Sequence, residues 1–337
     1  MGILLVHTAG LFGFDQTEPL YEFSQFGDRL RELITLILSN RCAPVFCMLF
    51  GVSFYLILKN PNYSGKKFAW RCVLLIGIGV LNKIFYTFDA LMWYGIWGIV
   101  LLSVRKCRPR TILFISIVSF LAAIILRRFH LGDLLFQPGV RYVENFTLYD
   151  IISYPLSDAV CAYLKVVLNG GIFTSFSYMV FGYWMAKQEM MNKIKSWATL
   201  KTVLILFALY MVFYIGGRSL SVITMIKVGC AIGAMFMATV FLYVYGFFPN
   251  GIKFLEAYGR MGLTNYSFQG VIGTCCMTLF LFPRQCDFVY ILLCMIMVYI
   301  GQCLFSYYWL RYFKYGPMEY LWRSLTSLQF TNPLKND

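Results

Sequence analysis

Long hydrophobic blocks separated by short charged joints make up nearly the whole chain, and this pattern limits the fold more than any other feature. Hydrophobic residues account for 60% of the 337 and charged residues for only 13%, which is far from the balance of a soluble domain. About 20 consecutive apolar residues cross a bilayer core. The pattern therefore predicts an all-α, polytopic integral membrane protein with about ten transmembrane helices in one bundle.

The predicted spans cover most of the sequence, and some of them need flanking residues to reach full length. They lie near residues 1–14, 42–58, 70–86, 90–104, 111–126, 166–186, 202–217, 224–247, 264–282 and 288–310. A single block of this kind could be a buried core helix, but ten in succession indicate a membrane bundle. We treat residues 1–326 as one transmembrane domain and 327–337 as a polar C-terminal tail.

Basic residues gather in every second joint. The joints at 59–71, 105–110, 187–201, 253–260 and after 310 hold 18 of the 29 Lys and Arg but only 4 of the 15 Asp and Glu. The remaining joints hold 11 of each sign, so the net charge of +14 falls on one predicted side. Because Lys and Arg near span ends stay inside, we expect both termini in the cytoplasm and the protein in the cytoplasmic (inner) membrane. Dispersed bases suit anionic lipid headgroups and exclude a nucleic-acid stripe.

Two long joints, 15–41 and 127–165, face outward in this topology and mix aromatic with acidic residues. Each is expected either to form an interfacial helix with a functional role or to cap the bundle. The 11 cysteines lie mostly in apolar spans and show no metal-ligand spacing, which is typical of small buried side chains. The sequence therefore predicts no metal site and no bound cofactor, and it leaves the oligomeric state open.

The first block, 1–14, is shorter than a full span, and we interpret the numbered start as lying inside the first helix. His7 in this block is one of only two histidines. An ionisable residue within a span indicates a functional site, although a hydrogen-bonded structural histidine is the alternative.

Four other polar residues at span ends are candidates. Arg41 opens the second span, where it could bind an oxyanion or anchor the helix. Asp89 begins the fourth span, where it could bind substrate or serve as an interfacial acid. Asn265 and Gln269 are four residues apart, so they share one helical face. That polar face indicates either a lined cavity or hydrogen bonds between helices.

The C-terminal region adds two expectations. Arg260 precedes the polar face of Asn265 and Gln269 on the side predicted to be cytoplasmic. Glu319 and Arg323 are four residues apart in a predicted tail helix, where an ion pair is expected.

Six sequence blocks, in chain order, resemble the YeiB-like membrane family, catalogued as domain of unknown function 418. They are GILLVHTAGLF (2–12), PVFCMLFGVSFYLIL (44–58), DALMWYGIWGIVLL (89–102), FSYMVFGYWMAK (176–187), GRMGLTNYSFQGVIGT (259–274) and FKYGPMEYLWRSLT (313–326). That family is grouped with the transmembrane acyltransferases. The resemblance implies a bacterial protein that takes an acetyl or acyl group from a cytoplasmic coenzyme A thioester. The acceptor is then an outward-facing glycan or a small hydroxyl or amine compound.

Within this resemblance His7 takes the place of a catalytic histidine, and imidazole suits a general base for a hydroxyl nucleophile. Arg41 and Asp89 become substrate or oxyanion candidates, whereas Arg260, Asn265 and Gln269 become candidates for the donor-side cavity. Acetyl-coenzyme A or acyl-coenzyme A is then a co-substrate. The arginine that precedes this histidine in related acyltransferases would fall before Met1. A solute transporter or permease and a non-catalytic membrane protein remain as alternatives.

Overall fold

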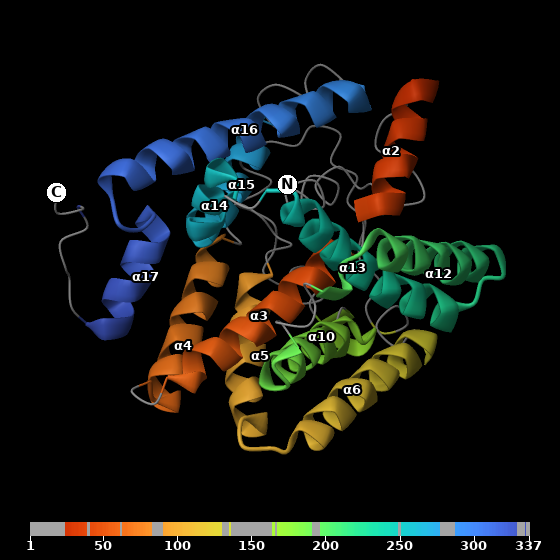
Figure 1. Cartoon of the computed structure of the whole chain (residues 1–337), viewed down its shortest axis with the longest axis horizontal. Coiled ribbons are helices and arrows are strands. Elements are labelled where there is room, and N and C mark those ends of the chain that lie inside the picture. The colour runs from red at the N-terminus through yellow and green to blue at the C-terminus, as the bar shows by residue number, and fades with distance from the viewer. Residues whose placement is uncertain are drawn as a thin grey trace.

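The structure is a computed structural model of the chain. It describes residues 24–38, 41–60, 63–82, 90–129, 135, 164–165, 167–190, 196–248, 251–276, 287–328 and 334. These residues form helices and no β-sheet (Figure 1). The all-α prediction is therefore confirmed for the part of the chain that the structure describes.

The helices follow the predicted spans closely. They are α2 (Gln25–Leu38), α3 (Cys42–Lys59), α4 (Gly65–Asn82), α5 (Leu91–Leu101) with the 3₁₀ turn η1 (Leu102–Val104), α6 (Pro109–Phe129), α10 (Gly171–Lys187), α12 (Leu200–Ser219), α13 (Ile223–Gly246), α14 (Lys253–Arg260), α15 (Gly262–Cys276), α16 (Phe288–Tyr312) and α17 (Pro317–Ser327).

Five of these helices, α3, α6, α12, α13 and α16, are long and apolar enough to cross a membrane. Their outer faces carry exposed large apolar side chains such as Phe114, Val212, Phe241 and Met297, as expected where lipid replaces water. The multi-pass membrane character is thus supported, and the number of ten spans stays a prediction. The predicted first span lies outside the described residues.

The centre of the bundle is a close crossing of α3 and α10. A Cβ atom built on Gly51 would lie 1.9 Å from the carbonyl oxygen of Met179, and one on Gly182 would lie 2.1 Å from that of Met48. Only glycine lets the two backbones touch in this way, as small residues do between membrane helices. The crossing therefore fixes which residues of α3 and α10 face one another.

Helix α10 also packs against α6, and two serines join them. The Ser116 hydroxyl donates to the Ser177 carbonyl at 3.0 Å, and the Ser177 hydroxyl donates to the Ser116 carbonyl at 2.9 Å. Farther along, the Tyr183 hydroxyl donates to the Arg105 carbonyl at 2.8 Å. Contacts in this order require α6 and α10 to run antiparallel, so the end of α6 lies beside the beginning of α10.

Aromatic side chains fill the space between the C-terminal halves of α3 and α10. The Phe54 ring meets the rings of Phe68 and Tyr183 edge-on, each at a centroid distance of 5.0 Å. Nearer the start of α10, Trp97 of α5 lies against Phe176 at a centroid distance of 4.5 Å. Edge-to-face and offset ring pairs of this kind stabilise a packed core. The space between the C-terminal halves of α3 and α10 is therefore filled with side chains.

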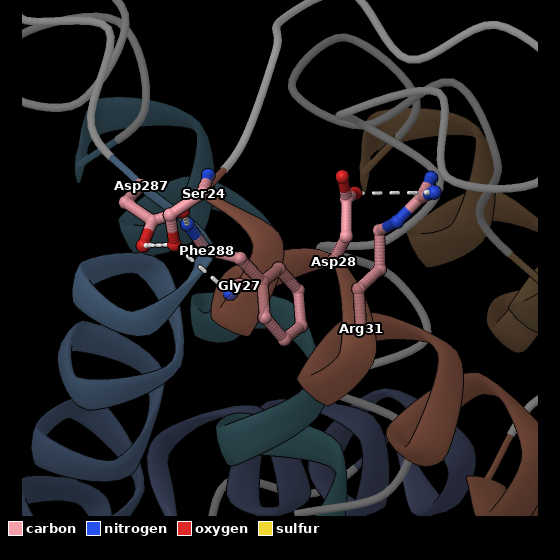
Figure 2. A network of polar contacts seen from close by, with 6 residues as sticks. All are labelled: Ser24, Gly27, Asp28, Arg31, Asp287 and Phe288. Atoms are coloured by element: carbon pink, nitrogen blue, oxygen red, sulfur yellow. Dashed lines mark hydrogen bonds and ion pairs between the residues drawn. The ribbon is translucent and has the colours of Figure 1, made fainter.

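Helix α2 confirms that the predicted outward loop 15–41 contains a helix, and a polar network ties it to α16 (Figure 2). The Asp287 carboxylate accepts hydrogen bonds from the Ser24 hydroxyl at 2.7 Å and from the Phe288 amide at 2.9 Å. Ser24 in turn accepts from the Gly27 amide at 3.0 Å. Ser24 and Asp287 are thus N-caps of α2 and α16, joined to each other.

Helix α17 holds the C-terminal helices to the rest of the bundle. The Trp322 indole donates to the Arg71 carbonyl at 3.0 Å, which joins α17 to α4. Glu319 accepts hydrogen bonds from the amides of Leu263 at 2.6 Å and Thr264 at 3.0 Å. The expected Glu319–Arg323 ion pair is therefore wrong. Glu319 instead caps the N-terminus of α15, and Arg323 lies 4.3 Å over the ring of Tyr315.

Candidate substrate cavity

A cavity of about 720 Å³ lies between α3, α6, α10 and α13. We call it the three-helix cavity, because the N-terminal ends of α3, α10 and α13 surround it. Its lining consists of Ala43, Pro44, Cys47, Arg127, Lys165, Asn169, Gly171, Thr174, Ser175, Tyr178, Ile223, Ile226, Lys227 and Cys230. The volume falls in the range of small-molecule sites.

Three helix N-termini meet at this cavity. Ala43, Gly171 and Ile223, all in the first turns of α3, α10 and α13, are among its lining residues. None of the three N-cap residues caps its helix through its own side chain. First-turn amides have no acceptor within their own helix, and helix N-termini carry partial positive charge. The positive ends of three helix dipoles therefore lie near the cavity.

Three cationic side chains add to that field. Arg127 lies in the last turn of α6, Lys165 lies a few residues before α10, and Lys227 is the fifth residue of α13. Among the described residues, no Asp or Glu lines the cavity. Cations inside an apolar segment are costly and usually face an interior or a polar ligand. The charged side chains that line the cavity are therefore all cationic in the part of the chain that the structure describes.

The inner wall of the cavity carries small polar groups. Cys47 is 1% exposed, and its thiol is within hydrogen-bonding reach of Ser175 and Tyr94. Tyr178 of α10 and Cys230 of α13 complete this wall. The wall can therefore bind hydroxyl or amine groups of a ligand by hydrogen bonds.

Arg41 lies beside the three-helix cavity and is not among its lining residues. It is 1% exposed, and its guanidinium lies 4.8 Å over the Tyr210 ring and 4.2 Å over the Tyr214 ring. Such cation–π contacts are strongest where water is excluded. The structure thus shows Arg41 joining the start of α3 to α12, and its role with an oxyanion stays a prediction.

Asn265 lies in the C-terminal half of the chain and is 2% exposed. Its side-chain amide donates to the Ser306 hydroxyl at 2.9 Å, and the Gln302 side-chain amide donates to its backbone carbonyl at 3.2 Å. Asn265 and Gln302 also line a second cavity of about 450 Å³ between α15, α16 and the start of α17. Asn265 therefore makes hydrogen bonds between helices and also lines a cavity, and its place on the donor side stays a prediction.

The other predicted site residues do not converge on either cavity in the described chain. Gln269 is buried on α15, and Arg260 is exposed at the end of α14. Neither lines the second cavity. His7 and Asp89 lie outside the described residues. No group of three or more potential metal ligands is found among the residues that the structure describes.

The sequence interpretation missed Arg127, Lys165 and Lys227 as a group. Charge counting treated all three as markers of the outward side. One signal was available, since Lys227 falls within the predicted span 224–247, and a charge in that position indicates a site. The grouping itself depends on contacts between α6, α10 and α13.

Comparison with known proteins gives relatives without an assigned function. The chain is 23% identical over 333 residues to an uncharacterized 39.9 kDa protein in the amylase 3′ region of Bacillus acidopullulyticus, covering 97% of this chain and 90% of the relative. It is 24% identical over 342 residues to the uncharacterized protein YxaH of Bacillus subtilis (strain 168), covering 89% and 82%. No solved structure matches the chain.

The C-terminal half carries the family signature. The uncharacterized protein YeiB of Escherichia coli (strain K12) is 44% identical over 91 residues, which cover 24% of this chain and 23% of YeiB. The family model described as "Protein of unknown function (DUF418)" matches residues 183–329. These residues include Tyr183, which packs on α3, and the whole of the α14–α17 unit with its Glu319 cap. Residues 183–329 therefore match the DUF418 family, and part of the chain is similar to YeiB.

Proposed function

We propose that this protein is a transmembrane acyltransferase, which moves an acetyl or other acyl group from a cytoplasmic coenzyme A thioester to a hydroxyl or amine acceptor. The observation that carries the proposal is the three-helix cavity. A volume of about 720 Å³ is sufficient for a sugar or a compound of similar size. It lies between helices that are apolar enough to span a membrane, and its inner wall offers hydrogen-bonding groups.

In the proposed reaction, the acceptor oxygen or nitrogen attacks the thioester carbonyl carbon, and the carbon–sulfur bond breaks. The proton of the acceptor passes to His7 and then to the departing coenzyme A sulfur, so His7 acts first as base and then as acid. Asp89 is assigned to bind the acceptor or orient His7. For Arg41 we favour a positioning role, because its guanidinium already lies over two tyrosine rings.

The donor enters, in this proposal, from the end of the bundle opposite the three-helix cavity. The aromatic contacts of Phe54 and Tyr183 fill the space between α3 and α10 at that end. We therefore place the donor path along α15 and α16, where Asn265 lines the second cavity. Arg260 lies at the end of α14, next to the start of α15, and its exposed guanidinium suits the phosphates of the coenzyme.

The test is transfer of labelled acetyl from acetyl-coenzyme A to endogenous acceptors in membrane vesicles that contain the full chain. If His7 is the base, the His7→Ala variant should lose about 10²–10⁴-fold of the transfer rate. The matched control is His130→Ala, which removes the other histidine of the chain and should leave the rate unchanged. A thermal-shift measurement of coenzyme A binding should give the same result for both variants.

Each contrary outcome removes a different part of the proposal. Absence of labelled product, together with absence of a coenzyme A-dependent shift, would refute acyl transfer and direct attention to solute uptake in proteoliposomes. Full transfer by His7→Ala would leave the reaction in place and remove His7 as the base. Equal loss in His7→Ala and His130→Ala would show that the assay reports folding.

A further inference from the structure

The positive groups around the three-helix cavity are of two kinds, cationic side chains and the N-terminal ends of helices. Arg127, Lys165 and Lys227 provide side-chain charge. The N-termini of α3, α10 and α13 provide backbone dipoles, and α10 and α13 are 17 and 24 residues long. These groups belong to four separate helices and to the segment before α10, so their convergence is a property of the fold.

We propose that the three-helix cavity binds an oxyanion, either a phosphate or a carboxylate, carried by the acyl acceptor. The identification of the ligand as the acyl acceptor rests on the proposed function. In that proposal the acceptor is on the outer side, and the charge pattern of the joints predicts that this end of the bundle faces outward. The anion site itself needs only the geometry of the cavity.

An oxyanion fits the chemistry of the lining. Arg127 has a planar guanidinium that can bind two oxygens of one phosphate or carboxylate. Lys165 and Lys227 supply compact charges with three donors each. Helix N-termini bind phosphate and carboxylate groups through their unpaired amides. An anion in the cavity can attract all three cations at once, whereas a neutral sugar carries no charge to attract them.

The inner wall fits the remainder of such a molecule. The Thr174 hydroxyl donates to the Gly170 carbonyl at 3.1 Å, and the Ser175 hydroxyl donates to the Gly171 carbonyl at 3.3 Å. Because their protons are used within α10, both hydroxyl oxygens remain as acceptors. They can accept from hydroxyl or amine groups of the ligand. The expected ligand is thus a hydroxylated compound with one phosphate or carboxylate.

The cavity contains its own reporters, Cys47 and Cys230, and Cys275 of α15 is an exposed control far along the chain. The experiment uses the full chain in phosphatidylcholine nanodiscs and follows maleimide labelling of each cysteine by peptide mass spectrometry. Glucose 6-phosphate and glucuronate should slow labelling of Cys47 and Cys230 and leave Cys275 unchanged. Unmodified glucose at the same ionic strength should protect much less.

The matched variants are Lys227→Met and Arg128→Met. Lys227→Met removes one cavity charge, and the concentration of glucose 6-phosphate needed for protection should rise about tenfold or more. Arg128 is the exposed neighbour of Arg127 and does not line the cavity, so Arg128→Met should match the wild type. Unchanged labelling of Cys275 in both variants would show that they are folded.

The remaining outcomes are decisive as well. Equal protection by glucose and glucose 6-phosphate, or no protection by any sugar, would overturn the proposal. Protection by coenzyme A alone would assign the cavity to the donor, and protection by phosphatidylglycerol in the nanodisc alone would assign it to a lipid headgroup. Both would overturn the acceptor site. Protection by sugar anions without acyl transfer in vesicles would keep the anion site and remove the proposed reaction.

Discussion

The crossing of α3 and α10 leads to the sharpest prediction about stability. In the Gly182→Ala variant the new methyl group would lie 2.1 Å from the Met48 carbonyl oxygen, whereas ordinary contact begins at 3.4 Å. The two backbones must therefore separate by about 1.3 Å, the difference between these distances. Overpacking of a tight core costs about 1–3 kcal/mol. At roughly 2–4 °C per kcal/mol, Tm should fall by several degrees.

The assay is thermal unfolding of the purified chain in detergent, followed by size-exclusion chromatography after heating. The matched control is Gly77→Ala in α4, where a new Cβ meets nothing within 4 Å. That variant should be as stable as the wild type or up to about 1 kcal/mol more stable, because alanine favours helix. If Gly182→Ala unfolded at the same temperature as Gly77→Ala, the close crossing would be refuted.

A second measurement connects this crossing to the cavity. Cys47 and Tyr178 adjoin Met48 and Met179, the two residues that the glycines touch, and both line the three-helix cavity. Separation of α3 and α10 in Gly182→Ala should therefore widen the cavity beside Cys47 and increase the rate at which maleimide labels Cys47. Gly51→Ala should lower the stability of the Gly182→Ala variant by less than it lowers that of the wild type. The reason is that both changes require the same separation of α3 and α10.

Two further predictions concern caps that join distant segments. In Glu319→Ala, the amides of Leu263 and Thr264 lose their acceptor. We therefore expect the free energy of unfolding to fall by about 1–3 kcal/mol and hydrogen exchange to become faster in the first turn of α15. Arg323→Ala is the control and should have a milder effect. Burial raises the pKa of Asp287, but hydrogen bonds from Ser24 and the Phe288 amide lower it more, so the folded pKa lies below 3.8. Asp287→Ala should therefore be about 1 kcal/mol less stable than the wild type at neutral pH. That difference should shrink as pH falls from 3.8 through the lower folded pKa in urea unfolding curves.

The helices could be predicted from sequence because each apolar block must satisfy its backbone hydrogen bonds internally in a membrane. The mixture of aromatic and acidic residues in joint 15–41 similarly indicated an interfacial helix as one alternative, and α2 lies within that joint. The same holds for Asn265, whose polar face on an apolar helix required partners, and Ser306 and Gln302 provide them. These features depend on local periodicity, which a single sequence contains.

Contacts between distant segments could not be predicted in this way. Glu319 was expected to pair with Arg323 one turn away, but its partners, Leu263 and Thr264, are 56 and 55 residues distant. A carboxylate that accepts two helix N-terminal amides gains more than an exposed pair of side chains. Similarly, the sequence of α13 marks Lys227 as unusual but does not show that Arg127 lies on the same cavity.

The basic residues of this chain therefore have two different physical meanings. Those in the alternating joints are expected to mark the cytoplasmic side and to contact lipid headgroups. Lys227 alone could be explained in the same way, since its side chain starts only five residues into α13 and can extend toward the membrane surface. First-turn residues of three helices line the same cavity, and the fold fixes their positions. Lys227→Met should therefore weaken anion binding without abolishing it, because Arg127 and Lys165 still line the cavity.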